Sequence, residues 1–314
     1  MTVDDAPGAS GAPGPDDPTL PEGTAVPVVP ETGSPDHNEV DFGFAAAATD
    51  RGLRHHRNED AFSLAVGSPG RAVIAVCDGV SSSANPHRAS AAAAAAAIDA
   101  LAPLLERPPA SDQAVADALR SAVAAAGAAV GTVDPDEPGG YPAAPSTTIV
   151  VAVVDPGRVA TGSIGDSRVY FLLPDEGTGS RLTVDDSLAE LAIAKGVPAG
   201  EAYSSPQAHV ITRWLGSNEG GGGDPAVNVV TPGRPGLLVV CTDGLWNSFE
   251  AAEQLAALAR PAAGVPAEAA RLLVRAALDA GGSDNVTVAV VAVGPDPDAA
   301  PGELPTGTTP AVDA

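Results

Sequence analysis

Residues 72–79 read AVIAVCDG, an apolar run rich in β-branched side chains that ends in Asp78-Gly79. Residues 237–244 read LLVVCTDG and repeat this design, with Asp243-Gly244 at the end of a second apolar run. Short Val- and Ile-rich runs that stop at a turn residue are typical of buried β-strands. An isolated Asp-Gly is most often a turn and nothing more. The recurrence of the pattern is what predicts both a sheet core and a cluster of carboxylates.

Four more segments border predicted strands; three present acidic residues and one is rich in threonine. They read RHHRNEDAF at 54–62, GSIGDSRVY at 162–170, GGSDNVTVAV at 281–290 and STTIVVAVV at 146–154. Carboxylates gathered at strand ends provide the hard oxygen ligands that Mg²⁺ and Mn²⁺ prefer and that suit Zn²⁺ poorly. Two such ions, about 3.5–4 Å apart, activate a water and clamp a phosphate for in-line attack. The sequence therefore predicts a site for Mn²⁺ or Mg²⁺.

The order of the predicted elements indicates the fold class. Strands are predicted near 42–50, 61–66, 71–77, 146–155, 158–163, 168–174, 226–231, 236–242 and 286–293, and helices over 86–105, 111–130, 186–196, 250–260 and 266–280. Strands come in clusters with helices in pairs between them, which favours an α+β fold with helices layered outside antiparallel sheets. Residues 197–225 show no clear element.

Charge and composition divide the chain into one domain and two tails. The formal net charge is −24, and residues 1–50 hold ten acidic residues and no Lys or Arg. Such acidity without a basic block argues against nucleic acid or an anionic membrane as a partner. Residues 1–41 and 295–314 are rich in Pro, Gly, Asp and Glu and are predicted to be disordered. Residues 42–294 are long enough for one domain with a substantial core.

Cysteine use and the N-terminus indicate a cytoplasmic protein. Cys77 and Cys241 are too few for a disulfide framework, so a reducing compartment is expected. Both are predicted to be buried small hydrophobes, with a redox-sensitive pair as the alternative. No signal peptide pattern is visible near Asp4 and Asp5, and no run of about 18 apolar residues predicts a membrane span. There is no serine-hydrolase elbow, P-loop or Cys-x-x-Cys motif.

In this order, the motifs resemble those of the PP2C-type (PPM) metal-dependent serine/threonine protein phosphatases, in their bacterial branch. The matching segments are NED at 58–60, DG at 78–79, STT at 146–148, GDSR at 165–168, LTVDDS at 182–187, HVITRWLG at 209–216, CTDGLW at 241–246 and SDNVTV at 283–288. The resemblance spans about residues 42–294. It implies an αββα sandwich, two antiparallel sheets packed face to face with helices on both outer sides. It also implies a hydrolase that removes phosphate from phosphoserine and phosphothreonine by direct attack of a metal-bridging water.

The resemblance also implies a role for each matching residue. Asp78 would bridge two core metal ions, and Asp243 and Asp284 would hold one of them, so these three aspartates would form the catalytic centre. The Gly79 carbonyl would hold one ion, and Asp166 would help to hold a third, weaker ion. The remaining pair, Glu59 and Asp60, would orient metal-bound waters. Residues 186–225 would form the variable flap beside the site.

Three departures from the family pattern concern substrate binding rather than metal binding. His55 stands where the family usually has an Arg that grips the phosphate. Residues 80–83 read Val-Ser-Ser-Ser, where a His or small residue and a Gly pair are usual, so leaving-group protonation is in question. Residues 185–187 read Asp-Asp-Ser, where Asp-His-Ser is frequent. No metal ligand is lost.

A basic cluster precedes the NED motif in this acidic chain. Arg54, His55 and Arg57 are candidates for binding the substrate phosphate, and a solvated loop is the alternative. Arg and protonated His both donate charge-assisted hydrogen bonds, but only Arg forms a bidentate fork. Arg168 is expected to be a structural ion-pair partner, and Trp214 and Trp246 to be packing residues.

The function predicted is that of a monomeric, cytoplasmic signalling phosphatase whose substrates are proteins phosphorylated by a serine/threonine kinase. Two alternatives remain open. One is a degenerate module that binds phosphoproteins without turnover, and the other is a specialised phosphatase for a single regulatory switch protein.

Overall fold

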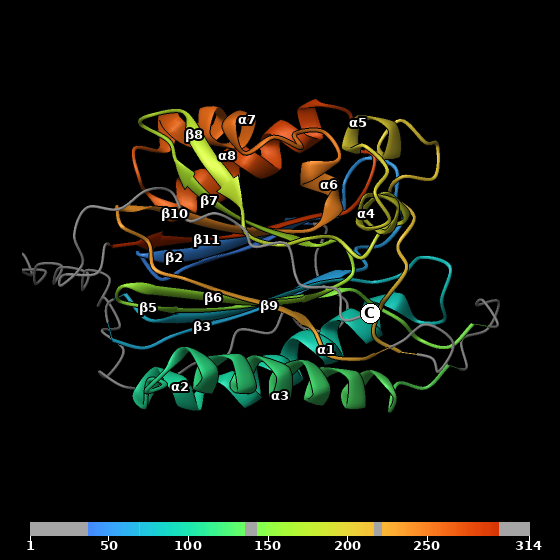
Figure 1. Ribbon diagram of the computed structural model, residues 1–314, viewed down its shortest axis with the longest axis horizontal. Coiled ribbons are helices and arrows are strands. Elements are labelled where there is room, and N and C mark those ends of the chain that lie inside the picture. Colours follow the sequence, from blue (N-terminus) through green and yellow to red (C-terminus); the bar gives the residue numbers. More distant parts are fainter. Residues whose placement is uncertain (1–36, 69, 136–142, 217–221, 295–314) are drawn as a thin grey trace, which may run out of the picture.

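The computed structural model describes residues 37–68, 70–135, 143–216 and 222–294. Two antiparallel sheets lie face to face, and helices cover both outer surfaces (Figure 1). One sheet has six strands in the order β1-β2-β11-β10-β7-β8: His37–Asp41 (β1), Ala45–Asp50 (β2), Val286–Val293 (β11), Gly236–Cys241 (β10), Arg168–Leu173 (β7) and Thr178–Arg181 (β8). The predicted α+β sandwich is confirmed.

The other sheet has five strands in the order β3-β4-β5-β6-β9. They are Asp60–Val66 (β3), Ala72–Asp78 (β4), Ile149–Asp155 (β5), Arg158–Ile164 (β6) and Ala226–Val230 (β9). The central strands β4 and β5 are apolar except for the Asp that ends each of them, and they are buried on both faces because each contacts the other sheet and a helix layer. The antiparallel register of β3 and β4 places Asp60 directly opposite Asp78, so two acidic motifs meet at one end of this sheet.

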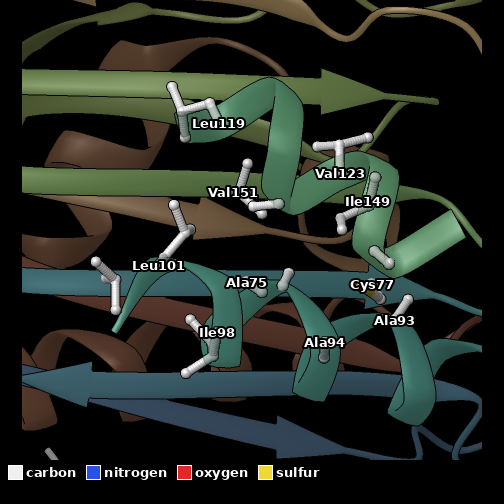
Figure 2. Packing of buried hydrophobic residues seen from close by; sticks show 14 of the residues in the cluster. Ala75, Cys77, Ala93, Ala94, Ile98, Leu101, Leu119, Val123, Ile149 and Val151 are labelled. Carbon is white, nitrogen blue, oxygen red and sulfur yellow. The ribbon is translucent and has the colours of Figure 1, made fainter. Parts of the chain in front are cut away.

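Three apolar layers hold the sandwich together. The middle layer lies between the sheets and includes Phe62, Ile74 and Leu238. The outer layer beneath the five-stranded sheet is formed by the helices Pro86–Leu101 (α1) and Asp112–Val130 (α3), whose apolar side chains pack on β4 and β5 (Figure 2). The helix pair Ala252–Ala259 (α7) and Pro266–Asp279 (α8) covers the six-stranded sheet in the same way.

Local sequence signals explain where the long helices begin. Ser111 caps α3 by accepting a hydrogen bond from the Ala114 amide at 3.2 Å, as its sequence predicts. Pro266 occupies the first turn of α8, where its missing amide hydrogen costs nothing. The segment Pro86–Glu106, which also contains the short helix Pro103–Glu106 (α2), is long and apolar enough to cross a membrane by length and composition. Its buried face instead packs on the five-stranded sheet.

The remaining helices are short. Two lie in the flap, residues 186–225: Leu188–Ala194 (α4) and Ala199–Ala202 (α5). One, Asp243–Trp246 (α6), follows β10 directly, and a 3₁₀ turn, Arg260–Ala262 (η1), joins α7 to α8. Figure 1 shows the flap helices at one end of the sandwich, on the same side as α6.

Several boundaries differ from the sequence predictions. The expectation of disorder as far as residue 41 is wrong for residues 37–41, because they form β1 and pair with β2. The domain therefore begins no later than His37. The strand β8 and the helices α5 and α6 were not predicted. The rest of both predicted tails, residues 1–36 and 295–314, lies outside the described residues.

Candidate active site

Four of the acidic residues predicted for the metal site, Asp78, Asp166, Asp243 and Asp284, line one pocket at the end of the sandwich that carries the flap. The pocket has a volume of about 210 Å³. Its four carboxylates come from four different motifs. The other lining residues are Gly79, Val80, Ser81, Thr148 and the flap residues His209 and Ile211. Sequence motifs up to two hundred residues apart thus meet at one site.

Asp78 is held by the threonine-rich motif, for which the sequence suggested no role. Its backbone amide donates to Thr148 Oγ1 at 3.1 Å, and its carbonyl accepts from Thr147 Oγ1 and from the Thr148 amide, both at 2.8 Å. The Thr148 hydroxyl also lies 2.9 Å from that of Ser167, beside Asp166. These bonds fix the end of β4, so the Asp78 carboxylate enters the pocket from a rigid backbone.

The glycines of both Asp-Gly pairs are required by backbone crowding. A Cβ on Gly79 would lie 2.6 Å from the Pro86 carbonyl oxygen and 2.8 Å from that of Glu59. A Cβ on Gly244 would lie 1.9 Å from the carbonyl oxygen of Asn285. Each glycine therefore lets its acidic loop approach a neighbouring motif more closely than any other residue could.

Asp243 and Asp284 face the pocket from adjacent strands of the six-stranded sheet. Asp243 opens α6, where Asn247 Nδ2 donates to its Oδ2 at 2.9 Å. Asp284 precedes β11 and accepts a hydrogen bond on Oδ1 from the Asn285 amide at 2.8 Å. The Nε2 atom of His55 lies 3.1 Å from the same oxygen. His55 is thus the member of the predicted basic cluster that the fold brings to the site.

Asn285 joins the last acidic motif to the first. Its side chain accepts from the Glu59 amide at 2.7 Å and donates to the Arg51 and Arg57 carbonyls at 2.7 and 3.1 Å. Glu59 in turn accepts a 2.6 Å hydrogen bond from Ser81, which lines the pocket. Glu59 therefore contacts the pocket lining through Ser81, and its role in orienting metal-bound waters stays a prediction.

Asp60 lies behind the pocket lining. It is 8% exposed, and its Oδ2 accepts a hydrogen bond from Thr242 at 2.8 Å. The Thr242 hydroxyl also accepts from the Thr287 amide at 3.0 Å, so this contact ties the ends of β3, β10 and β11 together. Asp60 thus supports the site from beneath.

Asp166 is positioned through its backbone by a buried aromatic and ionic network. Trp246 Nε1 donates to the Asp166 carbonyl at 2.9 Å, and the Arg168 guanidinium lies 3.5 Å above the Trp246 ring. Arg168 is buried and forms a bidentate pair with Asp185, with contacts of 2.6 to 3.1 Å. The predictions that Arg168 is a structural ion-pair partner and Trp246 a packing residue agree with this arrangement.

The electrostatics of the pocket suit a divalent cation. Burial, reinforced by neighbouring carboxylates, raises the pKa of Asp60 to about 8 and that of Asp243 to about 6. The same causes lift the pKa values of Asp78 and Asp166 well above the usual range. Among the described residues, Asp60 Oδ1 and Asp243 Oδ1 are buried oxygens without a hydrogen-bond partner. Clustered carboxylates with unsatisfied hard oxygens fit Mn²⁺ or Mg²⁺.

The carboxylates face one another without forming a compact ligand set. Within the described ranges, no three His, Cys, Asp or Glu side chains meet as a ready-made metal site. The individual ligand assignments remain predictions that rest on the shared pocket and the chemistry of its donors.

None of the three basic-cluster residues is part of the pocket lining; His55 reaches the lining through its contact with Asp284, whereas the two arginines have other neighbours. Arg57 extends toward α1, where its Nη1 lies 3.0 Å from His87 Nδ1. Arg54 lies near Gly281, on the loop before the last acidic motif. Sequence proximity to the NED motif could not distinguish these directions from that of His55. The structure thus favours His55 over Arg54 and Arg57 as the phosphate contact.

The two cysteines occupy separate apolar layers. Cys77 packs under α1 and Cys241 packs under α7 and α8, and both are free thiols. Burial raises the pKa of both thiols above the usual range. Their predicted role as small hydrophobes is confirmed, and a redox pair between them is excluded by this separation.

Comparison with known proteins identifies the family. A family model described as protein phosphatase 2C matches residues 51–280. The serine/threonine protein phosphatase PstP of Mycobacterium tuberculosis is 33% identical over 252 residues, which are 79% of this chain and 44% of that protein. The serine/threonine phosphatase stp of Listeria innocua is 31% identical over 146 residues, which are 46% of this chain and 56% of that protein. The chain thus spans about half the length of these relatives.

Solved structures agree with the sequence comparison. The PPM Ser-Thr phosphatase MsPP of Mycobacterium smegmatis, in complex with cacodylate, is 34% identical with a TM-score of 0.60, and the match covers 80% of this chain and 98% of that one. The catalytic domain of PstP in complex with two manganese ions is 29% identical with a TM-score of 0.58, and the match covers 79% and 97%. The carboxylate pocket, its supporting threonines and these similarities show that the chain belongs to the protein phosphatase 2C family.

Proposed function

We propose that this protein is a metal-dependent phosphatase that hydrolyses phosphoserine and phosphothreonine in proteins. One observation carries the proposal: four carboxylates from four motifs line a single pocket, and burial with neighbouring carboxylates raises the pKa of three of them, Asp78, Asp166 and Asp243. Such a pocket suits divalent cations and, through them, an anionic phosphate. Family membership supports the same reaction.

Each pocket residue has a proposed task. The core ions, Mn²⁺ or Mg²⁺, would be held by Asp78, Asp243, Asp284 and the Gly79 carbonyl. Asp166 would help to hold a third, weaker ion. Glu59 and Asp60 would support these ligands from behind the pocket. When bound, these ions would lower the pKa of a water molecule attached to them and would balance the negative charge of the phosphate. The chain itself supplies rigidity, because Thr148, Asn285 and Thr242 fix the backbone around the carboxylates.

His55 is the proposed contact for the substrate phosphate. Its ring lies at the rim of the pocket, 3.1 Å from Asp284, and its side chain is about one third exposed. A protonated imidazole there donates a charge-assisted hydrogen bond to phosphate. Arg54 and Arg57 would have to leave their present positions to take over this task.

The substrates proposed are proteins phosphorylated by a serine/threonine kinase, and the compartment proposed is the cytoplasm. The buried free thiols support a reducing compartment. The acidic surface, with a net charge of −24, does not favour nucleic acid as a partner. A monomer remains the expected state.

The decisive experiment is hydrolysis of p-nitrophenyl phosphate with Mn²⁺ and Mg²⁺ titrated separately after chelation. Turnover should vanish with the chelator and return with at least one ion, because carboxylate sites bind these ions reversibly. A matched assay with a phosphothreonine peptide tests the substrate class. Full turnover after exhaustive chelation would refute the metal mechanism. Binding of the phosphopeptide without turnover of either substrate would establish the degenerate binding module instead.

A further inference from the structure

His209 is a flap residue that reaches the carboxylate pocket. It opens the segment His209–Gly216 and lines the pocket together with Ile211. Its side chain is exposed, so it is accessible to a substrate. Among the pocket-lining residues that the structure describes, it is the only histidine. The sequence motif HVITRWLG drew attention to this segment without indicating a role for its first residue.

The His209 ring packs against two aromatic rings that are themselves fixed. Its centroid lies 5.4 Å from that of Trp246 and 5.9 Å from that of Tyr203. Trp246 is buried and donates to the Asp166 carbonyl at 2.9 Å. The Tyr203 hydroxyl donates to Glu190 at 2.7 Å. The imidazole is therefore held beside the pocket on a defined platform.

The backbone on either side of this ring is anchored as well. Val210 accepts from the Leu188 amide at 3.0 Å, and the Thr212 amide donates to the Asp186 carbonyl at 2.8 Å. Further along, Leu215 exchanges two backbone hydrogen bonds with Thr147, at 2.8 and 3.0 Å. Thr147 is the residue that also binds the Asp78 carbonyl. The segment is thus tied to the rest of the flap near its start and to the backbone that holds Asp78 near its end.

One task in the proposed reaction lacks a residue. When an alkyl phosphate ester is cleaved, the leaving oxygen must gain a proton, and a positioned general acid usually provides it. Residues 80–83, which follow the first Asp-Gly pair, contain no ionisable side chain. The carboxylates of the pocket are committed to cations. Imidazole is the side chain best suited to donate a proton near neutral pH.

We propose that His209 is the proton donor to the leaving seryl or threonyl oxygen, an inference that rests on the phosphatase function proposed above. Water adds to phosphorus as the bond between phosphorus and the ester oxygen breaks. The electron pair of that bond goes to the ester oxygen, which takes a proton from a ring nitrogen of His209. The products are inorganic phosphate and the free hydroxyl side chain. The neutral imidazole then regains a proton from solvent, so His209 is unchanged after each cycle.

The test compares two substrates that differ in their need for a proton. p-Nitrophenyl phosphate releases a stabilised phenolate, whereas a phosphothreonine peptide releases an alcohol oxygen that must be protonated. The variants are His209→Phe, which keeps the aromatic packing without a donor, and His209→Asn, which keeps a polar side chain without the acid. The matched control is Gln207→Ala, an exposed flap change two residues away. All proteins are assayed with saturating Mn²⁺.

Both His209 variants should lose about 10²–10⁴-fold in kcat on the phosphothreonine peptide, the usual range for a general acid. Their kcat on p-nitrophenyl phosphate should stay near the wild-type value, and the control should match wild type on both substrates. Equal losses on both substrates would overturn the proposal and assign the ring to flap packing. Unchanged peptide turnover in either variant would also overturn it. Failure of the wild type on both substrates would instead refute the phosphatase function itself.

Discussion

Replacing Asp60 with Asn should make the metal-free protein more stable at alkaline pH, although the change lies beneath the active site. Asp60 is 8% exposed, and one of its oxygens has no hydrogen-bond partner among the described residues. Burial raises its pKa to about 8, and the charges of Asp243 and Asp284 add to the effect. The ionised carboxylate is therefore destabilising wherever no cation balances it.

The sign and size of the effect follow from proton linkage. The folded-state pKa of Asp60 lies above the unfolded value of about 3.9, so the folded protein binds the proton more tightly between these values. The free energy of unfolding must then fall as pH rises from 5 to 8, by about 3 kcal/mol for this one group. At about 2–4 °C per kcal/mol for a domain of this size, the melting temperature should fall by about 6–12 °C.

Calorimetric melts of chelated protein between pH 5 and 8 measure this slope. The Asp60→Asn variant should show a clearly smaller fall of melting temperature with pH. Saturating Mn²⁺ should also reduce this fall in the wild type, because the cation balances the ionised carboxylates. Asp155→Asn is the matched control. It removes a buried carboxylate that pairs with Arg158 at the opposite end of its sheet, and it should keep the wild-type slope. A flat wild-type profile, or a variant slope equal to that of wild type, would refute the reasoning.

Three further predictions concern single residues. Asp243→Asn should lower kcat by orders of magnitude with little change in melting temperature, because it removes a charge and keeps the shape; near wild-type turnover at saturating metal would show that it is not a ligand. Gly244→Ala should lower the melting temperature strongly because its Cβ would lie 1.9 Å from a backbone oxygen, whereas Gly200→Ala, which meets nothing within 4 Å, should not; equal melts would contradict this. His55→Ala should raise KM more than Arg57→Ala in steady-state assays, and the reverse order would assign the phosphate contact to the arginine.

The sandwich could be predicted from the sequence because its central strands are apolar on both faces. The strands that escaped prediction, β1 and β8, are the two edges of the six-stranded sheet. Their sequences, HNEVD and TGSR, are polar, and none of their residues is fully buried. An edge strand has one neighbour and a solvated face, so backbone pairing rather than an apolar pattern determines where it forms.

The sequence alone predicts the acidic residues of the site, but it does not predict how the side chains around them are placed. Asp78, Asp243 and Asp284 stand at the ends of apolar runs, so sequence alone places them at strand ends. The pairing of Arg57 with His87 and the approach of His209 to the pocket depend on how α1 and the flap pack. Such contacts join residues far apart along the chain, and no local pattern encodes them.

The platform beneath His209 also gives the protein an optical property. The chain has two tryptophans, Trp214 and Trp246. The Trp246 indole is in contact with both the Arg168 guanidinium and the His209 ring, and its nitrogen donates a hydrogen bond to the Asp166 carbonyl. Indole fluorescence responds to nearby charge, and a Trp214→Phe protein would keep Trp246, next to the pocket, as its single tryptophan. Its emission would report the arrival of an ion or a phosphate directly, without any label attached to the molecule.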